Sequence, residues 1–349
     1  MHIASAASAL PPYQYSQQVL LSALVRHWGA KLDNPRFLER LHGRVGVETR
    51  SLSLPLEMYT GIKTWGEANN HWIEVAQTLG EKALRLALER AGLNPSDLGA
   101  LFFVSITGVC SPSIDARLVN RLRLPSDIKR VPIFGLGCVA GAAGIARAAD
   151  YVKAYPDQVA AVVAVELCSL TLQKEDLSVA NLISSGLFGD GAAATLIAGS
   201  ERNSPGPAIL ATRSVFYPDT EQVMGWDISE KGFRIVLSRE VPEVVDKHLA
   251  DDVDAFLAAH GLTRTDIQSW VLHTGGPRIL EATEIALKLP PGALAASWEC
   301  LRRTGNLSSA SVIFVLEEFM MNRRPAAGSY GLLAAMGPGF CSELVLLRW

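Results

Sequence analysis

The 349-residue sequence has no excess of either charge and few blocks of like charge. It carries 32 Lys and Arg residues against 35 Asp and Glu residues, a formal net charge of −3 at pH 7. This balance excludes a protein that binds nucleic acid through bulk positive charge. Only 19% of the residues are charged and 49% are hydrophobic, which argues against disorder and predicts a compact, apolar globular protein.

Long apolar runs of the kind that cross membranes are also missing. The apolar segment 131–146 is shorter than the about 20 residues that a spanning helix needs, and it contains Pro132 and several glycines. We therefore expect no membrane span. The first residues, MHIASAASALPP, lack the early Lys or Arg of a secretion signal and run into two prolines, so they predict a first β-strand.

Paired cysteines are absent as well. The five cysteines form no CxxC or CxH pair, which excludes a zinc ribbon and argues against a disulfide framework. We expect a reducing, cytoplasmic location. The cysteines are Cys110, Cys138, Cys168, Cys300 and Cys341.

An internal repeat organises the chain. Two segments share an amphipathic helix, a Gly-Leu pair, a polar turn that ends in Asp, and an apolar run. Gly92 matches Gly261 and Asp97 matches Asp266, both at a separation of 169 residues. The apolar runs that follow are typical of buried parallel strands.

The repeat continues in the same order. Cys138 and Asn306, 168 residues apart, each follow a glycine and precede a helix that begins with small residues. The motifs GLFGDG and AAMGPGF then match before a further apolar run. We predict an α/β protein of two similar halves, residues 1–205 and 206–349, each a mixed or parallel sheet with helices on its faces. Packing about a pseudo-two-fold axis would bring Cys138 and Asn306 into one shared site.

Cys138 lies at the expected start of a helix, between Gly137 and the small residues VAGAAG. A helix N-terminus stabilises a thiolate, and small neighbours let a bulky substrate approach the sulfur. The alternative is a buried structural cysteine in a tight helix contact, which the local pattern leaves open.

His273 and Asn306 complete a candidate catalytic set. His273 ends an apolar strand before Thr-Gly-Gly-Pro, where α/β proteins place site residues, although a core histidine is the alternative. Asn306 alone is typical of a helix N-cap. With Cys138, however, an imidazolium could hold a thiolate, and the His N–H and Asn amide could bind a thioester oxyanion. Since no metal motif, GxGxxG or P-loop is present, the residues favour cysteine-centred acyl chemistry.

Five motifs in this order resemble the bacterial type III polyketide synthases, the chalcone-synthase-like branch of the thiolase superfamily. They are GLGCVAGAAGIARAADYV, GLFGDGAAA, HTGGPRIL, GNLSSASVIFVLEE and MGPGF, and the resemblance covers about residues 3–347. It implies a thiolase-like αβαβα architecture built from two duplicated halves.

The resemblance also implies a reaction. Cys138 would take a starter acyl group from coenzyme A and hold the growing chain, while His273 and Asn306 would stabilise the thioester oxyanion and assist decarboxylation of malonyl-CoA. The expected reaction is iterative condensation by a homodimer, without acyl carrier protein, metal or cofactor beyond the coenzyme A thioesters. A medium- or long-chain fatty acyl starter and a pyrone or resorcinol-type product are expected.

Further positions match the family by spacing. Phe188 matches the aromatic gate between the coenzyme A tunnel and the reaction cavity, and the second gate falls at Ile235, with Phe233 as the alternative. Small cavity residues would leave room for an aliphatic starter. The matches are Cys168, Thr171, Ser184 and Ser308 for the cavity, Cys110 and Ser111 for a loop that reaches into the partner's site, and Arg40 and Arg44 for the coenzyme A phosphates.

Related alternatives differ in these motifs. Initiating ketoacyl synthases share the Cys-His-Asn set, but Gln and Asn usually follow their His, whereas Thr-Gly-Gly-Pro follows His273. Hydroxymethylglutaryl-CoA synthases add a catalytic Glu, and no such acidic motif stands out near Cys138. A papain-like hydrolase usually has its Cys near the N-terminus and disulfides. A catalytically silent acyl-CoA-binding homologue would be expected to lack part of the set.

Overall fold

The computed structural model describes residues 1–32, 34 and 36–349. Within these residues a nine-stranded sheet has the strand order β11-β12-β13-β8-β1-β7-β6-β4-β5. Its strands are β1 (His2–Ala9), β4 (Leu98–Val104), β5 (Lys129–Ile133), β6 (Val159–Leu167), β7 (Asp190–Ala198), β8 (Ala208–Phe216), β11 (Ile267–Leu272), β12 (Tyr330–Gly337) and β13 (Cys341–Arg348). The first strand, β1, confirms the prediction for the N-terminal segment.

The two halves of the sheet repeat one pairing pattern. In the first half β1 pairs antiparallel with β7, β7 antiparallel with β6, and β6 parallel with β4. In the second half β8 pairs antiparallel with β13, β13 antiparallel with β12, and β12 parallel with β11. β1 and β8 join the halves, and β5 extends the first half at its edge. This mirrored order confirms the predicted duplicated, thiolase-like α/β fold.

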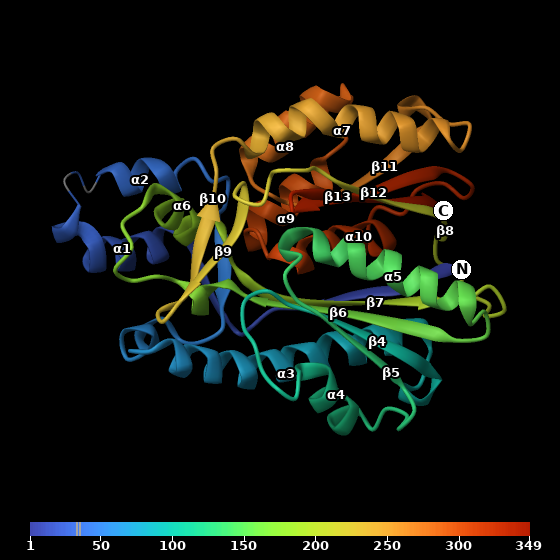
Figure 1. Ribbon diagram of the computed structural model, residues 1–349, viewed down its shortest axis with the longest axis horizontal. Helices are drawn as coiled ribbons and strands as arrows, with labels where there is room; N and C mark the ends of the chain where they lie inside the picture. Colours follow the sequence, from blue (N-terminus) through green and yellow to red (C-terminus); the bar gives the residue numbers. More distant parts are fainter. Residues whose placement is uncertain (33, 35) are drawn as a thin grey trace.

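Helices cover the sheet in layers (Figure 1). Helices α7 and α8 lie outside the second half, α3 and α4 lie outside the first, and α5 and α10 lie between the halves. Ile145 of α5 and Leu316 of α10 are fully buried in this central layer. These helices are α3 (Trp65–Ala91), α4 (Ile114–Leu122), α5 (Ala140–Ala154), α7 (Val241–Ala258), α8 (Pro277–Leu287) and α10 (Ser311–Met321).

The repeated turns have the same local cause in both halves. Gly92 ends α3 with φ 64°, and Gly261 follows α7 with φ 69°, in the left-handed region that glycine adopts without strain. Asp97 and Asp266 each close a capping box three residues after Asn94 and Thr263, immediately before a strand. The sequence repeat is therefore a repeat of helix ends and strand starts.

One detail of the predicted repeat is wrong. The turns η4 (Gly137–Val139) and η7 (Ser308–Ala310) lead into α5 and α10 and are 171 residues apart, rather than the 168 inferred from the motifs. Asn306 therefore precedes its turn instead of opening a helix. It forms an isolated parallel β-bridge with Phe188, because three further residues are used in the bend.

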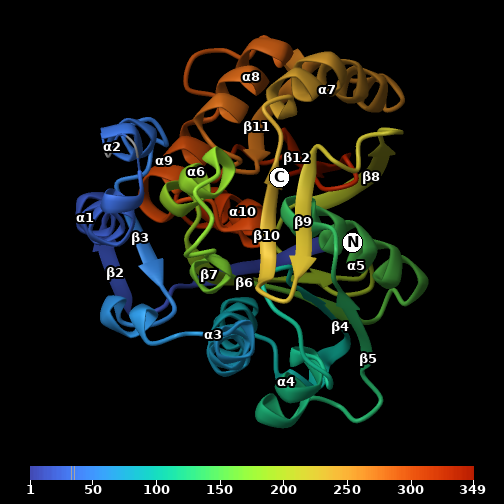
Figure 2. The same cartoon turned by 60° about the vertical axis from the view of Figure 1, so that its left-hand side comes forward.

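Smaller elements flank one end of the sheet. The hairpin of β9 and β10 stands next to α6 (Figure 2), and β2 pairs with β3. These elements are β2 (Tyr13–Ser16), α1 (Gln17–Trp28), α2 (Arg36–His42), β3 (Thr49–Leu52), α6 (Val179–Leu187), β9 (Met224–Ser229), β10 (Gly232–Leu237) and α9 (Ala295–Thr304). None of the helices among the described residues has the length and apolar character to cross a bilayer.

The loop 199–207 joins β7 to β8, where the sequence predicts a linker. The central core takes side chains from both sides of this loop, for example Ile145 and Val271. The division into domains 1–205 and 206–349 therefore stays a prediction.

Candidate active site

A cavity of about 1680 Å³ lies beside Cys138. Its walls come from α1, the start of α3, η5 (Cys168–Thr171), α6 and the β9–β10 hairpin. Most of the predicted cavity residues line it. They are Cys138, Cys168, Thr171, Ser184, Phe188, Ile235 and Ser308, together with Phe233, the alternative second gate.

Cys110 and Ser111 do not line the cavity of their own chain. The side chain of Asn69, on α3, donates to the Val109 carbonyl at 2.8 Å and accepts from the Val109 N–H at 2.9 Å. This pair holds the loop against α3 rather than over the cavity. The reach of Cys110 and Ser111 into a partner's cavity stays a prediction.

Arg40 and Arg44 also lie outside the cavity lining. Both are exposed, Arg40 on α2 and Arg44 just after it, and the Arg40 guanidinium lies 6.0 Å from the centre of the Phe37 ring. Their contact with coenzyme A phosphates stays a prediction.

Cys138 lies in η4, directly before α5, and is 7% exposed. Its thiol donates to the Ser308 hydroxyl over an Sγ–Oγ distance of 3.7 Å. Burial raises the pKa of this thiol to about 12; the Glu166 charge adds to the rise, while hydrogen bonds from Ser308 and Asn306 oppose it. The chain therefore buries its candidate nucleophile at the cavity wall in the neutral thiol form.

His273 follows β11, and its backbone N–H donates to the Ala334 carbonyl at 3.1 Å. Its ring is 8% exposed, and neither ring nitrogen has a hydrogen-bond partner in the described part of the chain. Burial lowers the pKa of His273 to about 4. A neutral imidazole has one N–H to donate and one nitrogen to accept, and buried groups of this kind are normally paired. The unpaired ring is thus available to a substrate.

These shifts bear on the expected ion pair between Cys138 and His273. Burial raises the pKa of the thiol and lowers the pKa of the imidazole, so both groups are stabilised in their neutral forms. In the empty cavity the electrostatics oppose the thiolate–imidazolium pair that the sequence predicts. Proton transfer from Cys138 would then accompany attack on a substrate.

The side chain of Asn306 is fixed at both ends. Its Oδ1 accepts from the Ser308 backbone N–H at 2.7 Å, and its Nδ2 donates to the Gly275 carbonyl at 3.3 Å. Gly275 lies two residues after His273, so this bond joins the two halves of the candidate catalytic set. One N–H of the amide remains for a further acceptor.

Phe188 follows α6 and is tied to Asn306 through the backbone. The Asn306 N–H donates to the Leu187 carbonyl at 2.9 Å, and the Gly189 N–H donates to the Asn306 carbonyl at 3.0 Å. The predicted gate and the predicted oxyanion donor therefore share one backbone contact.

Sequence reasoning missed a buried acid near Cys138. Glu166 lies near the end of β6, is fully buried, and accepts from the Ile106 N–H at 3.1 Å and the Thr107 hydroxyl at 3.0 Å. The Ser309 hydroxyl also donates to it. Burial raises the pKa of Glu166 to about 7, against these hydrogen bonds. A Glu inside the apolar run VAAVVAVEL was the available signal, and it corrects the expectation that no acid lies near the cysteine.

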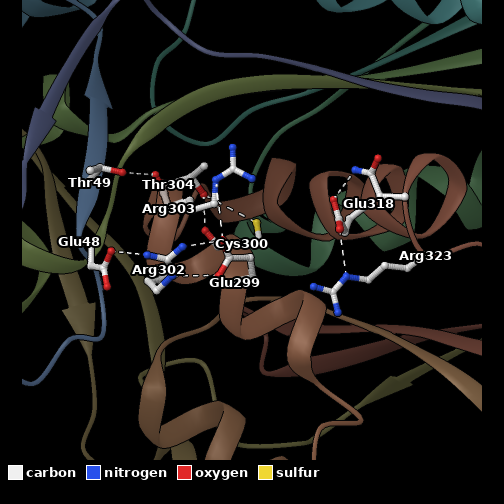
Figure 3. Close-up of polar contacts among 10 residues, drawn as sticks. Glu48, Thr49, Glu299, Cys300, Arg302, Arg303, Thr304, Glu318 and Arg323 are labelled. Carbon is white, nitrogen blue, oxygen red and sulfur yellow. Dashed lines mark hydrogen bonds and ion pairs between the residues drawn. The ribbon is translucent and has the colours of Figure 1, made fainter.

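Ion pairs hold the chain just before Asn306 (Figure 3). Arg302, on α9, pairs with Glu299 at 2.7 Å and with Glu48. The Thr49 hydroxyl donates to the Arg303 carbonyl at 2.6 Å. The end of α9 is therefore anchored to the segment around β3.

Comparison with known proteins matches this arrangement along nearly the whole chain. The family model "FAE1/Type III polyketide synthase-like protein" matches residues 10–208, and "Chalcone and stilbene synthases, C-terminal domain" matches residues 208–349. The 1,3,6,8-tetrahydroxynaphthalene synthase of Streptomyces peucetius subsp. caesius is 49% identical, over 99% of this chain and 93% of its own length. The 3,5-dihydroxyphenylacetyl-CoA synthase of Streptomyces toyocaensis is 31% identical, over 99% and 90%.

A solved structure shows the same fold. The crystal structure of 1,3,6,8-tetrahydroxynaphthalene synthase from Streptomyces coelicolor A3(2), described as a bacterial type III polyketide synthase, superposes with a TM-score of 0.95 at 32% identity. The superposition covers 100% of this chain and 99% of that one.

Proposed function

The chain belongs to the type III polyketide synthases, which are acyl-CoA condensing enzymes, and from this premise we propose that Cys138 carries the growing acyl chain. The thiol would pass its proton to His273 as its sulfur attacks the thioester carbonyl of an acyl-CoA. Coenzyme A thiol would then leave, and the acyl group would remain on Cys138. The buried position of Cys138 on the cavity wall supports this role.

The observation that carries the proposal is the buried, unpaired imidazole of His273. Its N–H and the free N–H of Asn306 would receive the oxygen of the thioester carbonyl when negative charge develops there. The same donors would receive the enolate oxygen formed when malonyl-CoA loses CO₂. The enolate carbon would attack the acyl thioester, and the Cys138 thiolate would leave.

This sequence of steps needs no cofactor. The coenzyme A thioester supplies the leaving group, and loss of CO₂ supplies the carbon nucleophile. We propose that the extender is presented directly as malonyl-CoA, without an acyl carrier protein. The initiating ketoacyl synthase and the catalytically silent homologue remain the alternatives for the experiment to exclude.

For the product, we propose a polyhydroxylated aromatic compound assembled from malonyl units. The support is the 49% identity to a 1,3,6,8-tetrahydroxynaphthalene synthase over 99% of this chain. A ten-carbon aromatic compound with oxygens on alternate carbons has the pattern of five two-carbon units. The cavity of about 1680 Å³ has ample room for such a chain.

A fatty acyl starter that gives a pyrone or resorcinol is the second candidate. It is favoured by the cavity size and by its apolar extension along α1, where Leu20, Ala23 and Leu24 line the wall. Small residues at Cys168 and Ser184 leave the wall between this extension and Cys138 uncrowded.

Product analysis by mass spectrometry tests these proposals together. The protein is incubated with malonyl-CoA alone and with malonyl-CoA plus acyl-CoA starters from two to eighteen carbons, roughly the chain lengths that a cavity of several hundred Å³ or more admits. A naphthalene-type product from malonyl-CoA alone supports the first candidate, and products that appear only with long starters support the second. No CO₂ release and no condensed product with any starter would contradict the proposed function.

We also propose a homodimer in the cytoplasm, with Cys110 and Ser111 directed toward the partner's cavity. The support is the exposed apolar surface near this loop, which includes Val109 and Phe134. Light scattering on the purified protein tests the dimer, and a monomer with full activity would contradict it.

A further inference from the structure

We propose that Arg50, on β3, is a positioning residue that holds the gate residue Phe188 and, through it, the backbone of Asn306. The inference rests on the proposed roles of those two residues. Arg50 lines the cavity but was not among the residues that the sequence pattern identified.

The first observation concerns the end of α6. The last carbonyls of a helix have no partner within it and must be satisfied from outside. Gln17 donates from Nε2 to the Gly186 carbonyl at 2.8 Å, and Asn306 donates from its backbone to the Leu187 carbonyl at 2.9 Å. Arg50 donates to the Phe188 carbonyl at 2.6 Å. Three consecutive carbonyls are therefore held by three residues from distant parts of the chain.

Two of these three partners are joined to each other. The Nε of Arg50 donates to Oε1 of Gln17 at 3.1 Å. Arg50 and Gln17 therefore form one clamp across the carbonyls of Gly186 and Phe188. A planar guanidinium can make both of its bonds at once in fixed directions, which a lysine ammonium on a flexible stem cannot reproduce.

The methylene groups of Arg50 make the second contact. Gly305, immediately before Asn306, has φ +71°, and a Cβ built there would lie 3.1 Å from Cδ of Arg50 and 2.6 Å from the Leu187 carbonyl oxygen. The Arg50 stem thus packs against the backbone that leads into Asn306. One side chain therefore touches both sides of the Phe188–Asn306 bridge.

The burial of Arg50 shows that the clamp is a designed contact rather than a surface ion pair. The side chain is 4% exposed, and desolvation lowers its pKa to about 10, while the nearby Asp190 charge partly restores it. Asp190 lies two residues after Phe188, so the counter-charge belongs to the same segment that Arg50 holds. Because a buried cation without such partners is unfavourable, the position requires the contacts it makes.

The experiment compares R50M and R50K with R264M as a matched control. Arg264 is also largely buried, and it donates to the Ala286 carbonyl at 3.1 Å and pairs with Asp254, but it does not line the cavity. Steady-state kcat and KM, product chain lengths, the thermal unfolding midpoint, and the rate of Cys138 alkylation by a small reagent are measured for each protein.

We expect R50M to lower kcat on the order of tenfold to a hundredfold with little change in KM, because misplaced donors weaken the reaction step more than binding. Shorter products and faster Cys138 alkylation should accompany the loss. R50K should recover part of kcat. R264M should lower the unfolding midpoint without changing kcat, product length or alkylation.

A change in the unfolding midpoint of R50M alone, with wild-type kcat, products and alkylation, would overturn the proposal and leave Arg50 a stabilising residue. Should R50M fail to fold, R50K and Q17M provide the same comparison, since each weakens one arm of the clamp. If the wild-type protein makes no polyketide, the proposed function fails, and the alkylation measurement still tests Arg50.

Discussion

The backbone of Phe188 forms a parallel bridge with the backbone of Asn306, although the two residues belong to different halves of the duplicated fold. Phe188 ends a helix of the first half, and Asn306 precedes a turn of the second. A shift of one residue therefore moves the other. The width of the gate and the position of the amide donor are coupled by geometry, so substitutions on either side of the bridge should affect both entry and reaction.

The first prediction concerns Cys138. Replacing it with Ala should abolish condensation, with a loss of about a thousandfold or more, since no other thiol or hydroxyl is placed to carry the acyl chain. The measurement is single-turnover formation of condensed product from malonyl-CoA. C300A is the matched control, because Cys300 is a thiol on α9 outside the cavity whose only side-chain contact is with Thr304. Retained synthesis in C138A would remove the assignment of the nucleophile.

The second prediction is the pH dependence of Cys138 alkylation in the free protein. The reactive form is the thiolate, and the pKa of the thiol is raised to about 12. The thiolate fraction should therefore be small at pH 7 and rise about tenfold per pH unit from pH 7 to 10, in contrast to an ordinary thiol, which levels off above about 8.5. Iodoacetamide labelling followed by peptide mass spectrometry measures the rate. A plateau below pH 8 would instead establish the thiolate–imidazolium pair with His273.

The buried carboxyl of Glu166 supplies a third prediction. Its pKa is raised to about 7, so above this pH it carries a negative charge that raises the pKa of the Cys138 thiol. E166Q should then speed alkylation of Cys138 above pH 8 by several-fold and leave the rate at pH 6 little changed. Equal acceleration at both pH values would mean that the substitution opens the cavity rather than removing a charge.

The parts of this fold that the sequence predicts are those set by local rules. Gly92 and Gly261 end helices because glycine adopts positive φ without strain, and Asp97 and Asp266 close capping boxes within three residues. Such signals repeat wherever the duplicated unit repeats. They are sufficient to indicate two halves, the strand at Ile3 and the positions of Cys138 and His273.

The parts that the sequence does not predict depend on long-range register. Glu166 meets Thr107 only because β6 pairs with β4, and Arg50 meets Phe188 across 138 residues of chain. The position of Asn306 also depends on a bend in which Ser308 adopts φ 47°, and this bend moves the structural repeat by three residues. A motif comparison aligns letters and has no means to count residues consumed by such a turn.

A fourth prediction tests the close packing of the two halves next to Cys138. Gly141, in the first turn of α5, faces η7, and a Cβ built there would lie 2.1 Å from the Ser309 carbonyl oxygen. G141A should therefore destabilise the protein by about 1–3 kcal/mol or prevent folding, because the backbone would have to shift. G66A is the control, since a Cβ there meets only the Thr64 side chain at 3.9 Å. Urea unfolding measures both, and equal stability of the two variants would contradict the close approach.

The last prediction concerns acid stability and rests on two buried groups with opposite signs. His42 is 2% exposed, and burial followed by the Arg50 charge lowers its pKa to about 4, against about 6.5 in an unfolded chain. Between pH 6.5 and 4 the unfolded chain binds a proton that the folded protein does not, so folding loses about 1.4 kcal/mol per pH unit. Glu166 acts in reverse: its folded pKa of about 7 exceeds the unfolded value, so the folded protein binds a proton first as the pH falls. Its contribution to stability therefore grows from pH 7 down to about 4.5.

Urea unfolding of H42Q and E166Q at pH 7, 6 and 5 separates these two contributions. H42Q is expected to be less stable than wild type at pH 7, because it loses the contacts of His42 with the Leu182 carbonyl and the Ser185 hydroxyl, both at 3.2 Å. That deficit should shrink by about 1.4 kcal/mol per pH unit below pH 6.5, whereas the deficit of E166Q should widen as the pH falls from 7. Parallel stability curves for wild type and either variant would show that the group in question does not change its protonation between the folded and unfolded states in this range.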